Sequence, residues 1–443
     1  MPGPMLDPFD ADSDLPARVD VVVIGGGIIG ASTALELAER GQSVLLCEKG
    51  VIGGEQSSRN WGWVRLAMRD PREIPLMIEA QKIWEGLDAR TGRRTGYRRA
   101  GILYAATDAK SYDRRERWSR HLAAHGVPGG MVSGAALDAL LPGRKVALKG
   151  GLHTPLDGMA EPQWAAPAIA AAARDRGATV LTGCAVRSLD LVAGRVAGVV
   201  TERGRVACDA VVLAGGAWSR LFAGNAGIAL PQLKILNTVM RTTPVEGGPD
   251  VTLWANSFAL RKRADGGYTV ASGVASTYDL VPDSFRLARA FFPALIHEWS
   301  SMDLRLTRRW LEEARQARRW GPEDVTPFEL DRILDPAPSA RVLRSCWAEA
   351  QQAFPVLGTA QVAQGWGGMI DVTPDAIPVI SGVDRLPGMF IATGFSGHGF
   401  GIGPGAGRLM ADLVLGATPV VDPVEFRLSR FTDGSRVHID PGY

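Results

Sequence analysis

The chain has 443 residues, 46% of them hydrophobic and 22% charged, and its formal net charge at pH 7 is +2. This length is enough for a large core and predicts a division into two domains. The near-neutral charge gives no reason to expect a nucleic-acid partner, and no apolar run reaches the length of a membrane span. We therefore expect a globular protein with no integral membrane segment.

The first 17 residues contain four prolines and four aspartates, and they lack the basic start and apolar core of a signal peptide. This composition predicts a flexible leader over residues 1–17 and a cytoplasmic location. The four cysteines form no CxxC pair and are expected to be buried and reduced, and the six histidines show no metal-ligand spacing. No metal site is predicted.

Residues 19–38 have the pattern of a strand, a glycine-rich turn and a helix. Gly25, Gly27 and Gly30 match the dinucleotide fingerprint, in which successive glycines permit the turn, admit a pyrophosphate and let the helix pack on the strand. A diphosphate would bind at the helix N-terminus. Glu48 ends the next predicted strand and is suited to accept hydrogen bonds from ribose hydroxyls. The alternative is a βαβ unit whose glycines serve packing only.

The loop after Glu48 combines large aromatic and polar side chains. Trp61 and Trp63 bracket a glycine and follow the polar run 55–60. Large aromatics require contact area and polar loop residues often bind ligands. A ribityl or isoalloxazine group beside the second strand would satisfy both, and the alternative is a loop folded under its own aromatic side chains.

The middle of the chain alternates between predicted helices and strands. Helices are expected at residues 75–90, 108–126 and 162–176, and strands at residues 97–106, 177–181, 196–201 and 206–214. Short strands separated by glycine-containing turns predict an antiparallel ribbon attached to the nucleotide-binding part.

From residue 231 the pattern changes to strands followed by helices. Strands are expected at residues 234–241, 253–260 and 268–272, and helices at residues 283–300 and 303–320. The last helix is rich in arginine, which we interpret as a solvated face offset by glutamates, with an anionic partner surface as the alternative. This block predicts an antiparallel sheet with helices on one side, facing the substrate.

The end of the chain repeats the pattern of its beginning. Residues 388–393 predict a buried strand, residues 394–403 a glycine-rich loop, and residues 404–415 a helix. A second helix N-terminus after a glycine loop is a second place where electron-rich atoms of a cofactor can bind.

Taken in order, these motifs resemble the FAD-dependent glycine/D-amino-acid oxidase family, which includes sarcosine oxidases, amino-acid dehydrogenases and amine oxidases. The matching segments are residues 23–30, Glu48, residues 212–219, residues 373–375 with 378–380, and residues 392–400. The resemblance implies an α/β (α+β) fold, with a Rossmann-like FAD-binding domain and a substrate domain whose mainly antiparallel sheet is covered by helices. It assigns residues 18–95, 152–230 and 357–443 to the FAD-binding domain, and residues 96–151 and 231–356 to the substrate-binding domain.

The resemblance also implies the parts of a cofactor site. The ADP half would be held by Gly25, Gly27, Gly30 and Glu48, with Val186 near the adenine. The flavin would be lined by Ser57, Ser58 and Asn60 and approached by Gly397, His398 and Gly399. The remaining predicted FAD contacts are Ile28, Ile29, Lys49, Arg59, Trp61, Ala214, Gly215, Trp218, Gly394, Phe400 and Gly401.

The implied reaction is hydride transfer from the carbon beside an amine to flavin N5, giving an imine that water hydrolyses. His398 and the helix after it are expected to stabilise negative charge at flavin N1/O2, and the alternative is that His398 only caps its loop. The predicted partners are a small-molecule amine or amino acid, and oxygen or an electron-accepting partner. The alternatives are a dehydrogenase subunit that passes electrons to a protein or a quinone, and a non-catalytic flavin-binding subunit.

The sequence departs from the sarcosine oxidase pattern at three points. Those enzymes attach FAD to a cysteine shortly before the Thr-Pro-Asp motif, whereas residues 367–372 contain none, which predicts non-covalent FAD. Gly401 replaces the lysine that binds the substrate carboxylate, and residues 269–272 offer no counterpart of the oxygen-activating lysine. Sarcosine is therefore not the expected substrate, and the choice between oxidase and dehydrogenase stays open.

An amino-acid substrate would need an arginine that binds its carboxylate through two hydrogen bonds. Arg65 is the first candidate and Arg261 and Arg344 follow, with a surface or structural charge as the alternative for each. An aromatic wall that favours a bulky or cyclic amine is predicted from Trp61, Trp63, Trp254 and Trp366. The predicted catalytic residues are His398, Arg65 and Trp366.

Overall fold

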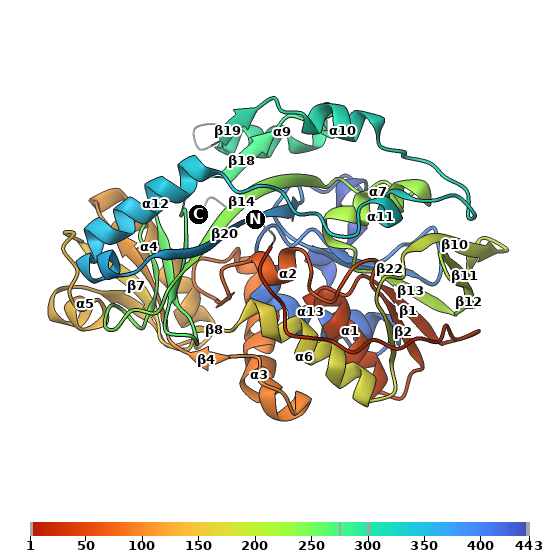
Figure 1. Ribbon diagram of the computed structural model, residues 1–443, viewed down its shortest axis with the longest axis horizontal. Helices are drawn as coiled ribbons and strands as arrows, with labels where there is room; N and C mark the ends of the chain where they lie inside the picture. Colours follow the sequence, from red (N-terminus) through yellow and green to blue (C-terminus); the bar gives the residue numbers. More distant parts are fainter. Residues whose placement is uncertain (1–2, 274–275, 299–301, 440–443) are drawn as a thin grey trace.

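The computed structural model describes residues 3–273, 276–298 and 302–439. A six-stranded sheet on the right of Figure 1 has the order β21-β22-β13-β1-β2-β9. Its edge strand β21 is antiparallel to β22, and the other neighbours pair in parallel. The strands are β1 (Val21–Ile24), β2 (Val44–Cys47), β9 (Thr179–Leu181), β13 (Ala210–Leu213), β21 (Val379–Gly382) and β22 (Met389–Thr393). The central ones are apolar throughout because both faces of this sheet are covered.

Four helices form a packed layer with this parallel sheet: α1 (Ile28–Glu39), α3 (Ile74–Thr91), α6 (Pro162–Asp175) and α13 (Gly399–Val414). The contact between α1 and α13 depends on small residues, since a Cβ at Gly407 would come within 2.5 Å of the Cβ of Ser32. The helix expected at residues 404–415 begins earlier, at Gly399. Gly401 and Gly403 pack closely on Trp63 and Ile28, which leaves little room for a side chain at these two positions.

The antiparallel ribbon attached to this sheet is confirmed and consists of β10 (Val186–Val192), β11 (Arg195–Thr201) and β12 (Gly204–Ala207). The single strand expected at residues 206–214 is divided between β12 in the ribbon and β13 in the parallel sheet. The chain turns at Cys208 and Asp209, whose N–H groups bond to the carbonyls of Ala197 and Asp20.

The second sheet is larger, mainly antiparallel and lies toward the left and top of Figure 1. Its strand order is β19-β18-β14-β17-β16-β15-β5-β7-β6, and β20 pairs with β14. The bounds are β5 (Ile102–Ala106), β6 (Gly130–Val132), β7 (Gly150–Thr154), β14 (Leu233–Thr242), β15 (Thr252–Trp254), β16 (Ala259–Lys262), β17 (Tyr268–Ala271), β18 (Ser276–Asp279), β19 (Met302–Arg305) and β20 (Val362–Val372). A small sheet of β3 (Trp63–Val64), β8 (Gly158–Met159) and β4 (Arg98–Arg99) joins the two parts.

Helices cover both faces of the large sheet, whereas the sequence predicted helices on one side only. The amphipathic helix α12 (Ala340–Ala353) buries Val342, Cys346 and Ala350 against it, and α4 (Ala109–Ala124) packs on β5 and β7. A further layer of α8 (Pro282–Arg286), α9 (Ala288–Glu298) and α10 (Arg309–Arg315) lies at the top of Figure 1. The short helices are α2 (Gln56–Arg59), α5 (Gly134–Leu140), α7 (Ser219–Asn225) and α11 (Pro327–Leu330). No described helix has both the length and the apolar content that crossing a membrane requires.

Three sequence-based expectations differ from the structure within this second part. The helix expected at residues 303–320 is replaced by β19, which pairs in parallel with β18, and by the short helix α10. The strand expected at residues 253–260 is a hairpin of β15 and β16, turned at Asn256 with a positive φ of 58°. The helix expected at residues 283–300 is broken into α8 and α9, and its last two residues lie outside the described part.

The strand β20 pairs with β14 along its whole length, from Leu233 opposite Val372 to Thr242 opposite Val362. It therefore belongs to the large sheet, although residues 357–443 were expected in the FAD-binding domain. The strand β7 likewise belongs to the large sheet and crosses the boundary expected at residue 152. The chain passes from β20 through the turn at residues 373–378 directly into β21 of the parallel sheet.

The segment 3–17, expected to be a flexible leader, lies against the parallel-sheet domain in the structure. The N–H groups of Asp7 and Asp12 donate to the carbonyls of Gln163 and Val180, and Phe9 and Leu15 pack against the two cores of this domain. The segment contains no helix or strand, yet the apolar side chains between its prolines pack against the parallel-sheet domain.

Candidate functional site

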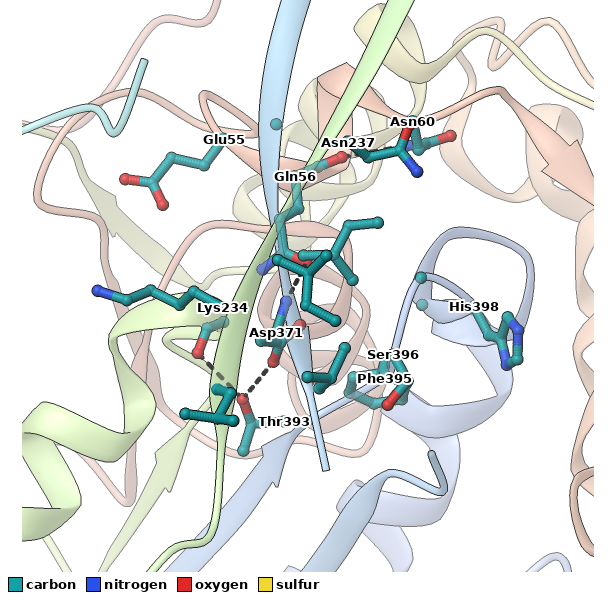
Figure 2. A pocket seen from close by; sticks show the side chains of 18 of the residues that line it. Glu55, Gln56, Asn60, Lys234, Asn237, Asp371, Thr393, Phe395, Ser396 and His398 are labelled. Carbon is teal, nitrogen blue, oxygen red and sulfur yellow. Dashed lines mark hydrogen bonds between the residues drawn. The ribbon is translucent and has the colours of Figure 1, made fainter. Parts of the chain in front are cut away.

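One cavity of about 1390 Å³ runs from the glycine turn before α1 to His398 at the start of α13. It lies between the parallel sheet and the large sheet. Figure 2 shows part of its wall, with Asp371 and Thr393 on one side and His398 on the other. Most of the predicted site residues line this cavity: Gly25, Gly27, Ile28, Ile29, Glu48, Lys49, Ser57, Arg59, Asn60, Trp61, Trp63, Arg65, Val186, Ala214, Gly215, Trp218, Trp254, Gly397, His398, Gly399, Phe400 and Gly401.

The glycine turn has the shape that a close approach of backbone to a ligand requires. Gly25 has a φ of 107°, and a Cβ there would meet the carbonyl of Ala214. Gly30 does not line the cavity: a Cβ at Gly30 would meet the carbonyl of Gly25, so this glycine permits the helix to start directly behind the turn. The first turn of α1 carries no acidic side chain. Its N-terminus therefore presents an uncompensated positive end of the helix dipole to the cavity.

Glu48 lies at the carboxyl end of β2 beside this turn. Its two oxygens accept hydrogen bonds of 2.7 Å from the N–H groups of Gly26 and Gly50. Burial raises the pKa of Glu48, and these hydrogen bonds together with Lys49 counteract the shift. Each carboxylate oxygen has a second lone pair, so the side chain is fixed in place and can still accept a hydroxyl hydrogen. Cys47, Cys184 and Val186 complete this end of the cavity.

The segment from Glu55 to Asn60 forms the wall next to the turn, largely as the short helix α2. Ser57 Oγ accepts a hydrogen bond of 2.8 Å from Ile28 N–H, and Asn60 closes the end of α2 through its bonds to the Gln56 and Ser57 carbonyls. Ser58 does not line the cavity, because its side chain points back to the carbonyl of Glu55. Lys49 bonds to Glu55 at 2.8 Å and lies 4.6 Å from the centroid of the Trp218 ring.

A buried carboxylate that sequence reasoning did not place in the site lies in the middle of the wall. Asp371 Oδ2 accepts hydrogen bonds from Gln232 at 2.9 Å, Thr393 at 3.0 Å and the Gly394 N–H at 2.7 Å. Burial raises its pKa, and these donors counteract the shift. Figure 2 shows its links to Thr393 and Gln56. The predicted residue Gly394 thus contributes a backbone donor behind the wall and does not line the cavity. A charged residue inside the otherwise apolar run 366–372 was the signal for this position.

His398 forms the far end of the cavity together with two buried charges. Its Nδ1 lies 3.2 Å from Glu73 Oε2, and Arg69 Nη1 lies 3.4 Å from Glu73 Oε1. Arg69 also donates to the His398 carbonyl at 3.1 Å. Burial lowers the pKa of His398 despite the neighbouring carboxylate, whereas Arg69 and His398 hold the pKa of Glu73 below its ordinary value despite its burial. A neutral imidazole at this position would donate its Nδ1–H to the Glu73 carboxylate. The i, i+4 spacing of Arg69 and Glu73 was the available sequence signal.

Three tryptophans and a tyrosine form an aromatic wall close to His398. Trp61 lies 5.2 Å from Trp63 and 5.5 Å from Trp254, measured between ring centroids, and Tyr104 stacks on Trp254 at 5.4 Å. Arg65 lies over the Tyr104 ring at 5.8 Å and donates to the Ala67 carbonyl at 2.6 Å. The same end of the cavity is lined by Arg69, Lys110, Arg114, Arg115 and Asn256. The sequence did not indicate Tyr104, Arg115 or Asn256 as site residues, because the segments around them carry no motif.

The structure corrects three other substrate-site expectations. Arg261 is 1% exposed and pairs with Glu161 through two bonds of 2.8 and 3.1 Å, so its charge stabilises the fold and does not reach the cavity. Arg344 is exposed on α12, on the far side of the large sheet from the cavity lining. Trp366 is 1% exposed and donates to the Arg59 carbonyl at 3.0 Å, outside the lining. Trp366 therefore supports the wall from behind and is not in a position to touch a substrate.

The position where sarcosine oxidases carry a lysine is tightly packed. A Cβ at Gly401 would come within 3.0 Å of the Trp63 carbonyl and 3.1 Å of the Val64 Cα. The Gly401 carbonyl in turn accepts a 2.8 Å bond from Trp84 Nε1. No group of three His, Cys, Asp or Glu side chains suited to a metal ion occurs in residues 3–273, 276–298 and 302–439.

The geometry of the residues that line the cavity fits FAD. A glycine cradle and a helix N-terminus suit a diphosphate, Glu48 suits a ribose, and a second helix N-terminus lies with an aromatic wall at the other end of the same cavity. A parallel sheet with these features defines a dinucleotide-binding flavoprotein. The chain belongs to the FAD-dependent oxidoreductase (DAO) family, whose model matches residues 20–413.

Comparisons with known proteins give relatives within this family. The chain is 33% identical to L-amino acid deaminase from Proteus myxofaciens, solved in complex with anthranilate, with a TM-score of 0.94 and 97% of each chain covered. It is 26% identical to sarcosine oxidase subunit beta from Rhizobium meliloti (strain 1021), over 94% of this chain and 89% of that protein. It is also 26% identical to 4-methylaminobutanoate oxidase (formaldehyde-forming) from Paenarthrobacter nicotinovorans, over 94% of this chain. The chain spans 46% of the length of this last relative.

Proposed function

We propose that this protein oxidises the C–N bond of an α-amino acid with an apolar or aromatic side chain, giving an imine that water hydrolyses to a 2-oxo acid. The observation that carries this proposal is the single cavity that joins the glycine cradle to an aromatic wall and to the N-terminus of α13. FAD, held non-covalently along the cavity, would accept the hydride and thus two electrons from the amino acid's α-carbon. The similarity to an L-amino acid deaminase, solved with an aromatic amino-carboxylate, supports this choice over a simple amine.

The residues at the His398 end would supply the conditions that the reaction needs. Arg65, Arg69, Lys110, Arg114 and Arg115 line it, and this positive charge favours the neutral amine over the ammonium form. Trp61, Trp63 and Trp254 exclude water and provide a flat surface for the side chain of the substrate.

The N-terminus of α13 supports the charge that develops on the cofactor. Its residues Gly399, Phe400 and Gly401 line the cavity, and the first turn carries no acid. Backbone N–H groups there would stabilise negative charge at the flavin pyrimidine. The neutral His398, whose Nδ1–H is donated to Glu73, would act by orienting this turn and not as a proton donor at Nδ1.

The electron acceptor is oxygen or a partner that accepts electrons. One anaerobic experiment tests the substrate class and separates these two acceptors. The purified holoenzyme is mixed anaerobically with a panel of amino acids of both configurations, secondary amines and hydroxy acids, and flavin absorbance is recorded. We expect bleaching by amino acids with large apolar side chains, and admitting air then shows whether oxygen reoxidises the flavin. A hydroxy acid or other nitrogen-free compound as the sole reductant would overturn the proposal.

A further inference from the structure

Arg115 is a buried cation at the wall of the cavity. It belongs to α4 and is 2% exposed. Its Nη1 donates to the Ser111 carbonyl at 3.0 Å and its Nη2 donates to Asn256 Oδ1 at 3.0 Å. Both acceptors are neutral, and Nε is buried with no hydrogen-bond partner among the described residues. The side chain is thus fixed in direction while its charge has no counter-ion in direct contact.

The other buried guanidinium groups of the protein show how unusual this is. Arg261 pairs with Glu161, Arg430 pairs with Asp375, and Arg69 pairs with Glu73, each with the arginine no more than 5% exposed. A buried charge without a partner is destabilising, because no Coulombic attraction offsets the loss of its hydration. Burial and the neighbouring Arg114 lower the pKa of Arg115 to about 10, which leaves it protonated at neutral pH.

No carboxylate of the described residues forms an ion pair with Arg115. Asp108, the N-cap of α4, attracts the guanidinium without pairing with it, and its side chain accepts from Ser111 N–H at 2.7 Å. Glu73 is shared between Arg69 and His398. Tyr104 and the cation Arg114 also interact with Arg115, and Lys110 lines the same cavity.

Asn256 is held in a fixed position opposite Arg115. It turns the β15–β16 hairpin with a φ of 58°, a left-handed conformation that asparagine adopts more readily than other residues with a side chain. Its side chain lines the cavity and orients Arg115 from the opposite side. The turn is also packed from behind, because a Cβ at Gly273 would meet the Asn256 carbonyl.

From these observations we propose that Arg115 binds an acidic group of the substrate, so that the enzyme accepts anionic amines and rejects amines without an acid group. This inference rests on the proposed function and adds the residue that selects for the acid group of the substrate. The substrate carboxylate would supply the missing counter-charge and accept hydrogen bonds from the guanidinium. Arg65, the sequence-based candidate, already donates to Ala67 and lies over the Tyr104 ring, whereas Nη1 and Nη2 of Arg115 each make one hydrogen bond to a neutral oxygen and each carry a second hydrogen.

The test uses benzoate and its neutral analogue benzamide, titrated into the holoenzyme and followed by the change in flavin absorbance. We expect the wild type to bind benzoate and to bind benzamide at least 100-fold more weakly. Arg115→Leu should weaken benzoate binding at least 100-fold and remove this discrimination, and Arg115→Lys should retain part of it. Arg117→Leu, an exposed position on the same helix, is the matched control and should leave binding unchanged.

Several outcomes would overturn the inference. The first is that Arg115→Leu binds benzoate as tightly as the wild type does. The second is that Arg65→Leu loses benzoate binding while Arg115→Leu keeps it. The third is that the wild type binds benzoate and benzamide equally well. If Arg115→Leu does not accumulate as holoenzyme, Arg115→Lys decides, because unchanged affinity and discrimination with a shorter, single-centre cation would contradict the assignment. Failure of the proposed function is distinguishable: Arg115-dependent benzoate binding in an enzyme that no amine reduces would reject amine oxidation alone.

A kinetic comparison gives a second readout. For an amino acid and the amine that lacks its carboxylate, we expect Arg115→Leu to raise the KM of the amino acid at least tenfold and to leave that of the amine unchanged. A purely structural role would change kcat and KM for both compounds together.

Discussion

Glu73 and His398 are separated by 325 residues in the chain, yet Oε2 of the carboxylate lies 3.2 Å from Nδ1 of the ring at the end of the cavity. Both groups titrate below their ordinary pKa values in the folded protein. Folding therefore favours the deprotonated form of each group. The pair connects the start of α3 to the start of α13, which gives its protonation a direct effect on the geometry of the site.

The pH dependence of stability follows from this shift. His398 is neutral in the folded protein and takes up a proton more readily when unfolded, so its contribution is complete above about pH 6.5 and is lost as the pH falls below that value. Between pH 7 and pH 5 the free energy of unfolding should fall by up to about 1.4 kcal/mol per pH unit from this group. Urea unfolding of wild type and His398→Gln at both pH values measures the difference, and equal slopes would contradict it.

Removing the carboxylate of Glu73 should be costly at neutral pH. Glu73→Gln leaves the buried Arg69 guanidinium without its negative partner, and we expect a loss of about 3 kcal/mol in the free energy of unfolding. Glu425→Gln is the control, because the side chain of Glu425 is 46% exposed and its Oε2 lies as far as 4.0 Å from Arg72 Nη1. Its replacement should cost less than about 0.5 kcal/mol. Similar losses in both variants would show that the buried cluster of Arg69, Glu73 and His398 contributes no more to the free energy of unfolding than an exposed ion pair does.

The glycine cradle should be sensitive to a single methyl group. In Gly30→Ala the new Cβ meets the Gly25 carbonyl, so the turn or the start of α1 must move. We expect the ratio of bound FAD to protein to fall at least tenfold, measured from the flavin absorbance of the purified protein. Gly86→Ala, inside α3 with open space around its Cβ position, should keep full FAD and gain about 0.5 kcal/mol in stability. Full FAD occupancy in Gly30→Ala would contradict the geometry.

Two buried arginines should respond in opposite ways to the same change. Arg115→Met removes a cation without a direct counter-ion, and its melting temperature should be no lower than that of the wild type. Arg430→Met breaks a pair with Asp375 in which Nε and Nη2 donate at 2.8 and 3.1 Å, and it should lose about 3 kcal/mol. Thermal unfolding of both holoenzymes measures the contrast. A marked loss in Arg115→Met would show that the residue is needed for folding.

The parts of the fold that depend on neighbouring residues could be predicted from the sequence. The strand, turn and helix around Gly25 and Gly30 need only local sterics, and the polar run of α2 follows directly after β2, so it had to lie near the turn. Trp61 and Trp63 were recognised because aromatic residues in a polar loop require a surface. The strand, glycine loop and helix at residues 388–415 were likewise predicted from their local pattern, although α13 begins at Gly399 and not at residue 404.

Distant contacts could not be read from composition or period. Residues 302–305 became a strand because β18 offered a free edge, which outweighs helix propensity in so short a segment. Arg261 had no visible partner until Glu161, 100 residues earlier, was brought beside it. Arg115 is the opposite case, since only the structure shows that no carboxylate of the described residues forms an ion pair with it.

The strand β20 connects the two parts of the molecule beside the cavity. It pairs with β14 in the large sheet, and only the short turn at residues 373–378 separates it from β21 of the parallel sheet, so the two sheets cannot move far apart at this point. The α8–α10 layer borders the same cavity through Phe285, Phe291 and Leu304. We therefore expect access to the cavity to depend on the apolar side chains of this layer more than on separation of the two sheets.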